Sequence, residues 1–217
     1  GKPIMDLIIS SLIKNNINDI VIVTGYKETQ LKSHLKKAFP NVIFQFINNK
    51  NYDKTNNIFS LALAFEKIKF DKDILMIESD LIYADGVIEK LINSKHKNLA
   101  LVSPYKTGLD GTVVEVRENK IIGLYPPHLQ TENFNLFDKF KTLNIYKFSK
   151  EFCKNEFKKL LIYYANSIDD NCYYELILGI LIYMQRQEIY CEIISNDKWV
   201  EVDDPNDLYS AEFHFNK

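Results

Sequence analysis

Helix-like and strand-like segments alternate through the first third of this chain, and this alternation limits the folds that it can adopt. Apolar residues recur at helical spacing over residues 4–13, and a β-branched run follows at 19–23. A second helical stretch at 31–38, preceded by Thr29 as a candidate N-cap, leads to a strand-like segment at 42–47. Helices that connect successive strands make right-handed crossovers between parallel strands. The alternation therefore predicts an α/β fold.

The pattern continues with a helix at 58–68 and an apolar strand at 74–77, after which the order of elements becomes mixed. The later segments are predicted as a helix at 87–92, a strand at 99–102, a hairpin formed by 112–116 and 121–124, a strand at 142–148, helices near 149–165 and 173–187, a strand at 189–194 and a helix at 205–213. We expect a mostly parallel, twisted sheet with helices on both faces. Because no linker, repeat or low-complexity tract interrupts the sequence, residues 1–217 are predicted to form a single domain.

Composition excludes several classes of protein. With 46% apolar and 26% charged residues, the chain has the make-up of an ordinary globular protein. Its net charge of −2 gives no sign of a nucleic-acid partner, and no apolar stretch is long enough for membrane insertion. The cysteines, Cys153, Cys172 and Cys191, are too widely spaced for a zinc or redox motif. Their odd number without a disulfide framework is typical of a reducing compartment, so we expect a cytoplasmic location.

Two acidic segments, far apart in the chain, carry most of the chemical information. The strand at 74–77 runs into Glu78-Ser79-Asp80, and a segment that begins at Trp199 contains Glu201 and Asp203. Open α/β sheets bind ligands at the carboxyl ends of their strands. Glu201 and Asp203 are two residues apart, so on an extended segment their side chains share a face. If they meet Asp80 at that edge, the three carboxylates form a hard-oxygen site suited to Mg²⁺ and a polyphosphate. Each segment by itself also fits a solvated loop.

Several segments, in order along almost the whole chain, resemble motifs of a known enzyme family. They are residues 20–26 (IVIVTGY), 55–61 (TNNIFSL), 78–82 (ESDLI), 110–114 (DGTVV), 141–148 (KTLNIYKF), 173–175 (YYE) and 199–203 (WVEVD). No single segment is specific, but the ordered set resembles the nucleotidyltransferases that activate phosphocholine, phosphonates and sugar 1-phosphates. The closest resemblance is to the bacterial phosphocholine and 2-aminoethylphosphonate cytidylyltransferases. It implies a Rossmann-like fold of the nucleotide-diphospho-sugar transferase type.

The resemblance also implies a reaction and its metal. An oxygen of a small phosphorylated or phosphonate acceptor, such as phosphocholine or 2-aminoethylphosphonate, would attack the α-phosphorus of a nucleoside triphosphate, with CTP expected. Pyrophosphate would be released. Catalysis of this kind depends on positioning and charge stabilisation. By resemblance, Asp80 and Glu201 are catalytic residues that bind Mg²⁺, and Asp203 is a third metal ligand.

The nucleotide is expected to contact two strand-to-helix connections. The residues concerned are Thr24, Gly25, Tyr26, Asn56, Asn57 and Ser60. A glycine at the end of a strand allows a base to approach the backbone, although a simple turn also explains Gly25. The free N–H groups at the start of the helix after Asn57 attract anions, and Asn57 is also a candidate N-cap of that helix.

The acceptor is expected to contact a second group of residues. They are Lys106, Lys141, Tyr173, Tyr174 and Glu175. Aromatic rings with a carboxylate suit an ammonium group, and Glu175 would be either the counter-charge of that group or a partner behind the metal ligands. The two lysines are candidate partners for the acceptor phosphate. With 13 tyrosines in the chain, most of the tyrosines must belong to the core or the surface.

The start of the chain departs from the family pattern. The family opens with a strand and a glycine-rich loop, G-x-G-[ST]-R, that cradles the triphosphate, whereas Gly1-Lys2-Pro3-Ile4 resembles the segment just after that loop. We therefore expect the chain to be N-terminally incomplete. Carboxylates without the basic loop leave the site negative, so we expect this chain to bind a nucleoside triphosphate weakly and to turn it over poorly or not at all. We also expect an unpaired central gap in the sheet, or a homodimer contact, at the place of the first strand.

Other functions remain compatible with the sequence. The acceptor could be a sugar 1-phosphate or another phosphorylated metabolite. A glycosyltransferase of the GT-A type would use Glu78-Ser79-Asp80 as a strand-ending metal motif, but this leaves Glu201 and Asp203 unexplained. A non-catalytic binding domain is the third alternative, and the collection of three acids at one sheet edge argues against it.

Overall fold

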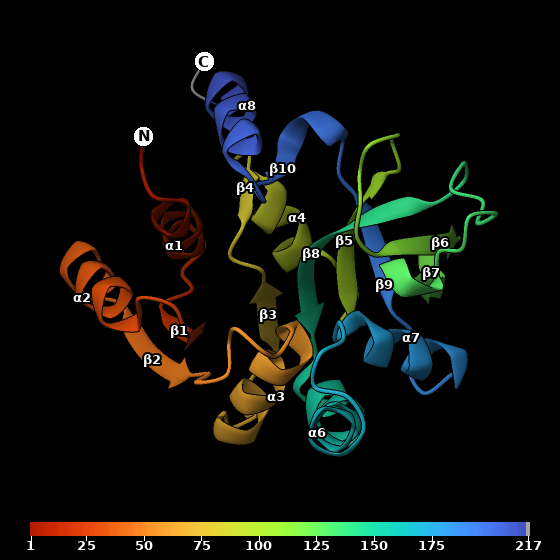
Figure 1. Ribbon diagram of the computed structural model, residues 1–217, viewed down its shortest axis with the longest axis horizontal. Helices are drawn as coiled ribbons and strands as arrows, with labels where there is room; N and C mark the ends of the chain where they lie inside the picture. The colour runs from red at the N-terminus through yellow and green to blue at the C-terminus, as the bar shows by residue number, and fades with distance from the viewer. Residues whose placement is uncertain (216–217) are drawn as a thin grey trace.

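A computed structural model describes residues 1–215 of the chain, and its strands form three sheets (Figure 1). The strands are β1 (Asp19–Thr24), β2 (Ile43–Asn48), β3 (Ile74–Ile77), β4 (Leu81–Tyr83), β5 (Leu99–Pro104), β6 (Val113–Arg117), β7 (Lys120–Tyr125), β8 (Phe140–Phe148), β9 (Tyr190–Ile193) and β10 (Trp199–Glu201). The helices are α1 (Ile4–Lys14), α2 (Glu28–Ala38), α3 (Asn57–Lys67), α4 (Val87–Asn93), α5 (Lys150–Phe152), α6 (Lys158–Ser167), α7 (Glu175–Tyr183) and α8 (Pro205–Phe215), with short helical turns η1 (Pro127–Leu129), η2 (Cys153–Phe157) and η3 (Asn196–Lys198). The predicted elements are present, most with ends displaced by a few residues.

The main sheet is mixed. Its strand order is β3-β8-β5-β9-β7-β6, and β8 also pairs with β6. The β5–β9 pair is parallel, as is β1–β2 in its own sheet, and the other pairs are antiparallel. The α/β class is confirmed, but parallel pairs are fewer than the alternation of elements predicts. The reason is β8, a nine-residue strand that returns antiparallel between β3 and β5.

The edges of β1 and β3 are unpaired on the sides that face one another. Among residues 1–215, β1 pairs only with β2, and β3 pairs only with β8. Apolar contacts nevertheless cross this gap, because Leu75 and Ile77 of β3 pack against the cluster that contains Ile20 and Ile22 of β1. Side-chain packing therefore joins the two strands without shared backbone hydrogen bonds.

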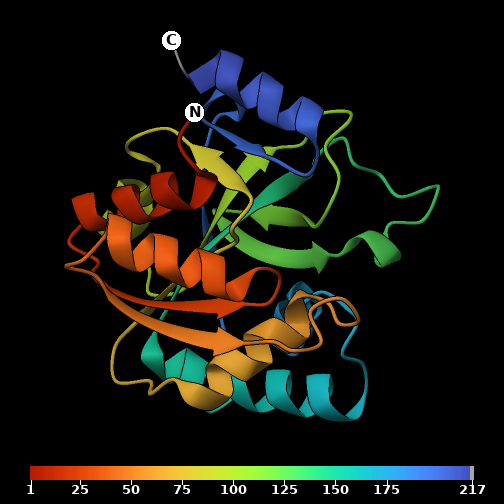
Figure 2. The ribbon, with the colours of Figure 1, turned by 60° about the vertical axis from the view of Figure 1, so that its left-hand side comes forward.

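Helices cover both faces of the main sheet (Figure 2). On β5, Ala100 and Val102 pack into a cluster with α3, α6 and α7, whereas Leu99 and Leu101 pack into a cluster with α4. Successive side chains of a strand point to opposite faces, so this alternation buries both sides of β5. Among the described residues, no helix is both long and apolar enough to cross a membrane.

Two helix caps differ from the sequence predictions. Thr29 is not the N-cap of α2, because that helix already begins at Glu28, after Lys27 in a left-handed conformation with φ of 50°. The N-cap of α3 is Asn56, whose side chain accepts a hydrogen bond from the Asn57 N–H at 2.7 Å. Asn57 is the first helical residue, and this position frees its side chain to point into the sheet edge.

A short ladder that the sequence does not predict joins the two acidic segments. β10 pairs antiparallel with β4, with Trp199 opposite Tyr83 and Glu201 opposite Leu81. Both strands have only three residues, which is too short for a periodic pattern. This ladder brings the end of β10 beside the end of β3, and it therefore sets the position of the site described below.

Phe157 packs in the core cluster that contains Phe65, Phe148 and Phe152, so we expect its truncation to lower the free energy of unfolding strongly. This side chain is fully buried, with its ring centroid 5.3 Å from that of Phe65 and 5.7 Å from those of Phe148 and Phe152. Phe157→Ala should lower the free energy of unfolding by about 3–5 kcal/mol in urea titrations, because it leaves a cavity. Tyr183→Ala is the matched control: its residue is 88% exposed, and its effect should be below about 0.5 kcal/mol. Similar losses in the two variants would contradict this packing.

Candidate functional site

Carboxylates from both acidic segments meet at one edge of the fold. Glu78 and Asp80 follow the carboxyl end of β3, and Glu201 is the last residue of β10. The Val202 N–H donates a hydrogen bond of 2.9 Å to the backbone carbonyl of Asp80, which holds the two segments side by side. The structure thus brings Asp80 and Glu201 together at the carboxyl end of a strand.

The only positive charge inside this cluster, among the described residues, belongs to Lys141 on β8. Its side chain is 1% exposed, and its ammonium nitrogen lies 3.1 Å from Oε2 of Glu201. The same nitrogen donates to the Thr142 carbonyl at 2.9 Å and lies 5.8 Å from the centroid of the Trp199 ring. A side chain on Gly111, whose φ is +87°, would come within 3.0 Å of this nitrogen. In this structure Lys141 is therefore the counter-charge of Glu201, whereas the sequence suggested a partner for the acceptor phosphate.

Two asparagines connect the carboxylates. The side-chain amide of Asn144 donates to Oε2 of Glu78 at 2.9 Å and to Oε1 of Glu201 at 3.0 Å. Asn57 donates to the other oxygen of Glu78 at 3.1 Å, and its own carbonyl accepts from the Tyr174 N–H at 2.9 Å. Both oxygens of Glu78 are thus fixed by amides from α3 and β8.

Burial and mutual repulsion make these carboxyl groups hard to ionise. Burial, followed by the charge of Asp80, raises the pKa of Glu78 from 4.5 to about 7. The pKa of Asp80 is raised by burial and further by Asp203, and that of Glu201 is raised by burial although Lys141 opposes the shift. Because mutual repulsion contributes to these shifts, a bound cation would make the carboxyl groups easier to ionise.

The cluster offers Mg²⁺ two carboxylates rather than a complete set of ligands. Oδ1 of Asp80 is buried without a hydrogen-bond partner among the described residues, which suits a metal ligand. Among the side chains that the structure describes, no group of three or more from His, Cys, Asp or Glu is arranged to hold a metal ion. Asp203 is exposed, although it is close enough to Asp80 to raise its pKa. Mg²⁺ is commonly held by one or two carboxylates together with substrate phosphates, so Asp80 and Glu201 fit this ion.

The first group of expected nucleotide contacts ends β1. The Thr24 hydroxyl donates to Glu28 at 2.8 Å, and Tyr26 is 67% exposed. What approaches Gly25 here is Tyr52, because a Cβ on Gly25 would lie 2.6 Å from the Tyr52 ring. The glycine therefore has a packing role in this structure.

The second group surrounds the start of α3. Asn56 caps the helix, and the Ser60 hydroxyl accepts from the side-chain amide of Asn49 at 3.0 Å. Asn49 is 1% exposed and also donates to Thr55 at 3.1 Å. The connection before α3 is thus held together by its own polar side chains.

The expected acceptor residues are split between surface and core. Lys106 is exposed on the loop after β5, and Tyr173 is 38% exposed. Tyr174 and Glu175 are buried, at 3% and 2% exposed. They lie behind Glu78 rather than in its solvent-facing surroundings, and Oε2 of Glu175 has no hydrogen-bond partner among the described residues. Burial, followed by the charge of Glu78, raises the pKa of Glu175 to about 8.

Sequence reasoning missed Glu78 and Asn144 as site residues. Glu78 precedes Asp80 by two residues, so its presence in the strand-ending triplet was a usable signal. Asn144 is a lone amide within the apolar strand segment 142–148, and this was a weaker signal. Neither signal indicates that the two side chains meet.

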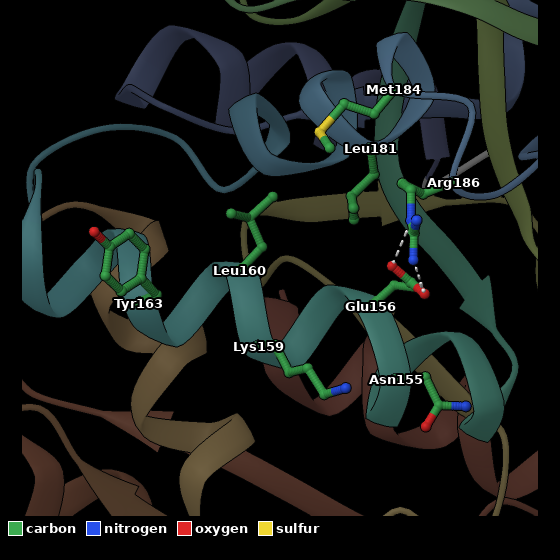
Figure 3. A pocket seen from close by; sticks show the side chains of 8 residues that line it. All are labelled: Asn155, Glu156, Lys159, Leu160, Tyr163, Leu181, Met184 and Arg186. Carbon is green, nitrogen blue, oxygen red and sulfur yellow. Dashed lines mark hydrogen bonds and ion pairs between the residues drawn. The ribbon is translucent and has the colours of Figure 1, made fainter.

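A surface depression elsewhere does not include any of these residues. It lies between η2–α6 and the end of α7 (Figure 3). Its volume is about 450 Å³. Two of its three charged residues, Glu156 and Arg186, already form a two-point ion pair with hydrogen bonds of 3.0 and 3.1 Å, and Lys159 is the third. We therefore place the candidate site at the carboxylate cluster.

Comparison with known proteins identifies the family. The model of the nucleotidyl transferase family matches residues 1–110, which is half of the chain and includes Glu78 and Asp80. The chain belongs to this family. The chain is 24% identical over 216 residues to a CMP-5'-(3-aminopropyl)phosphonate synthase of Streptomyces rubellomurinus, covering 99% of this chain but only 34% of that protein. It is 28% identical over 229 residues to a CTP:phosphoglutamine cytidylyltransferase of Campylobacter jejuni, covering 96% of this chain and 86% of the relative.

Solved structures share the fold of this nucleotidyl transferase. The CTP:phosphocholine cytidylyltransferase from Streptococcus pneumoniae superimposes with a TM-score of 0.76 at 17% identity, over 98% of this chain and 85% of the other. The inositol-1-phosphate CTP transferase from T. maritima gives a TM-score of 0.75 at 16% identity, over 97% and 81% of the two chains. The expected nucleotide-diphospho-sugar transferase type of fold is thereby confirmed.

The buried Glu175 predicts a dependence of stability on pH. Because its folded pKa of about 8 exceeds the ordinary 4.5, the folded state holds a proton that the unfolded state releases between these values. The stabilisation is complete below pH 4.5 and is lost as the pH rises to 8, by up to about 1.4 kcal/mol per pH unit. Glu175→Gln should remove this contribution and flatten the decline of the unfolding free energy between pH 5 and 8 in urea titrations.

An exposed glutamate provides the control for this experiment. Glu132 lies on the loop after η1, and Glu132→Gln should keep the slope of the parent protein. If Glu175→Gln also kept that slope, Glu175 would be ionised in the folded protein and the assignment would be wrong.

Proposed function

We propose that this nucleotidyl transferase moves a CMP group from CTP to a small phosphorylated or phosphonate acceptor. An acceptor oxygen would form a bond to the α-phosphorus while the bond from that phosphorus to the bridging oxygen breaks, and pyrophosphate would leave. A fully ionised acceptor oxyanion has no proton to lose, so the chain does not have to supply a base. The observation that carries the proposal is the meeting of Asp80 and Glu201 at the sheet edge, with one buried Asp80 oxygen unpartnered.

Asp80 and Glu201 would hold Mg²⁺, and Asp203 is the candidate for a third ligand. When bound, the ion supplies positive charge that stabilises the phosphate oxygens in the transition state. Lys141 limits the negative charge of the cluster, and Asn57 and Asn144 keep Glu78 fixed beside it. Fixed charges and dipoles of this kind stabilise a transition state without reorganising during the reaction.

The names of the two relatives support CTP and a particular class of acceptor. One is named for a CMP-aminopropylphosphonate product and the other for CTP and phosphoglutamine. Both acceptors are small nitrogen-containing molecules that carry a phosphorus oxyanion. We therefore propose this class for the present chain, with Lys106 and Tyr173 as the exposed residues available to contact it.

A turnover screen tests the proposal directly. Purified protein would be incubated with Mg²⁺ and each nucleoside triphosphate, together with 2-aminoethylphosphonate, 3-aminopropylphosphonate, phosphocholine, phosphoglutamine or glucose 1-phosphate. ³¹P NMR would follow the release of pyrophosphate. We expect slow formation of product with CTP and one of the nitrogen-containing acceptors, since nucleotide binding is expected to be weak. Turnover only with glucose 1-phosphate would support a sugar nucleotidyltransferase, and hydrolysis of a nucleotide sugar without use of the triphosphate would support a glycosyltransferase.

Replacing Asp80 should separate activity from stability. Asp80→Asn removes a ligand of the proposed ion, so turnover should fall by about 10³-fold or more. Its thermal midpoint should stay equal or rise, because the native carboxyl has a pKa raised by burial and by Asp203. The control is Asp85→Asn, at an exposed residue after β4 that pairs with Lys14 on the surface. Full activity in Asp80→Asn would contradict the proposal.

A further inference from the structure

The longest strand of the main sheet, β8, contains a backbone irregularity at Asn144. The φ of this residue is +57°, in the left-handed region that asparagine tolerates better than most residues other than glycine. The pairing of β8 with β5 shifts at the same place, because Ala100 pairs with Tyr146 whereas Val102 pairs with Thr142. A β-bulge of this kind changes the direction of a side chain, and bulges are frequent beside active sites.

The β-bulge directs the side-chain amide of Asn144 to the carboxylates of Glu78 and Glu201. The Nδ2 group of Asn144 donates both of its hydrogen bonds within the cluster, to Glu78 and to Glu201. Its carbonyl oxygen accepts from the Thr142 hydroxyl at 2.8 Å, so the amide cannot rotate without losing a buried partner. The backbone carbonyl of Asn144 also accepts from the Glu78 N–H at 3.2 Å. One residue therefore connects the end of β3 with the end of β10.

Among the described residues, no side chain other than Asn144 donates hydrogen bonds to both Glu78 and Glu201. Lys141 binds Glu201 but has no contact with Glu78 within hydrogen-bond distance, and Asn57 binds Glu78 but not Glu201. Without the Asn144 amide, the two carboxylates would face one another with no donor between them. Like charges at short range repel, and Lys141 would be the remaining partner of Glu201. The Glu201 side chain would then be free to turn away from Asp80.

We propose that Asn144 is a positioning residue, whose amide fixes Glu78 and Glu201 relative to one another and so directs Glu201 towards the ion shared with Asp80. This inference rests on the proposed function, and it names a residue that does not itself touch the metal or the substrates. Partners that orient metal ligands typically affect metal affinity and activity by about 10- to 100-fold.

Two substitutions separate the amide from the backbone conformation. Asn144→Gly keeps the left-handed conformation without strain but removes the amide, whereas Asn144→Ala removes the amide and adds strain. Both should lower the affinity for Mn²⁺ by about 10- to 100-fold in calorimetric titrations with CTP present. Both should lower kcat by a similar factor while KM for CTP changes by less than about threefold. Both variants lose these hydrogen bonds, so both should lower the thermal midpoint of the protein without ligands, and Asn144→Ala should lower it further because it also adds backbone strain.

The outcomes distinguish this inference from the proposed function. If Asn144→Gly kept the Mn²⁺ affinity of the parent protein, the positioning role would be overturned, whatever the activity. If both variants unfolded at the same lower temperature, with affinity lost in proportion to folded protein, Asn144 would be a structural residue only. A parent protein that binds Mn²⁺ but does not use CTP overturns the proposed function alone. A parent protein that binds no Mn²⁺ overturns both.

Discussion

The buried ion pair between Lys141 and Glu201 is the interaction on which the rest of this site depends. Acidic groups gather at one sheet edge, and each of them would be costly to bury as an isolated charge. Lys141 is nearly inaccessible and opposes the rise in the pKa of Glu201 from within the protein, while amides satisfy the oxygens of Glu78. The remaining excess of negative charge, together with the unpartnered oxygen of Asp80, leaves a site that favours a cation. The chemistry that we propose follows from this imbalance.

The strands determine where the charged and polar groups of the site lie. β3 delivers Glu78 and Asp80, the short β4–β10 ladder delivers Glu201, and β8 crosses between them with Lys141, Thr142 and Asn144 (Figure 1). Because β8 is buried on both faces, its polar residues have few conformations open to them, and they contact Glu78 and Glu201 from a rigid element. The same strand therefore stabilises the core and orients the site.

Much of the fold and part of the site could be predicted from sequence. The alternation of periodic segments predicted the helices and strands, and the apolar strand ending in Glu78-Ser79-Asp80 predicted carboxylates at a ligand-binding edge. The antiparallel return of β8 could not be predicted, because strand pairing is a long-range property with no local signal. The burial of Lys141 and the left-handed Asn144 were equally inaccessible, since lysine usually lies on surfaces and a single amide within a strand normally indicates nothing. The motif resemblance placed Tyr174 and Glu175 near the acceptor, and no local signal indicated that the structure buries both behind Glu78.

Paramagnetic broadening by Mn²⁺ tests the central claim, which is that the carboxylates at the ends of β3 and β10 form one cation site. In ¹H–¹⁵N NMR spectra of the parent protein with CTP, substoichiometric Mn²⁺ should first remove the backbone signals of Leu81 and Val202 and the side-chain amide signal of Asn144. Signals from the depression between Glu156 and Arg186 should persist. Broadening centred on that depression, or spread evenly over exposed acidic residues, would contradict the account.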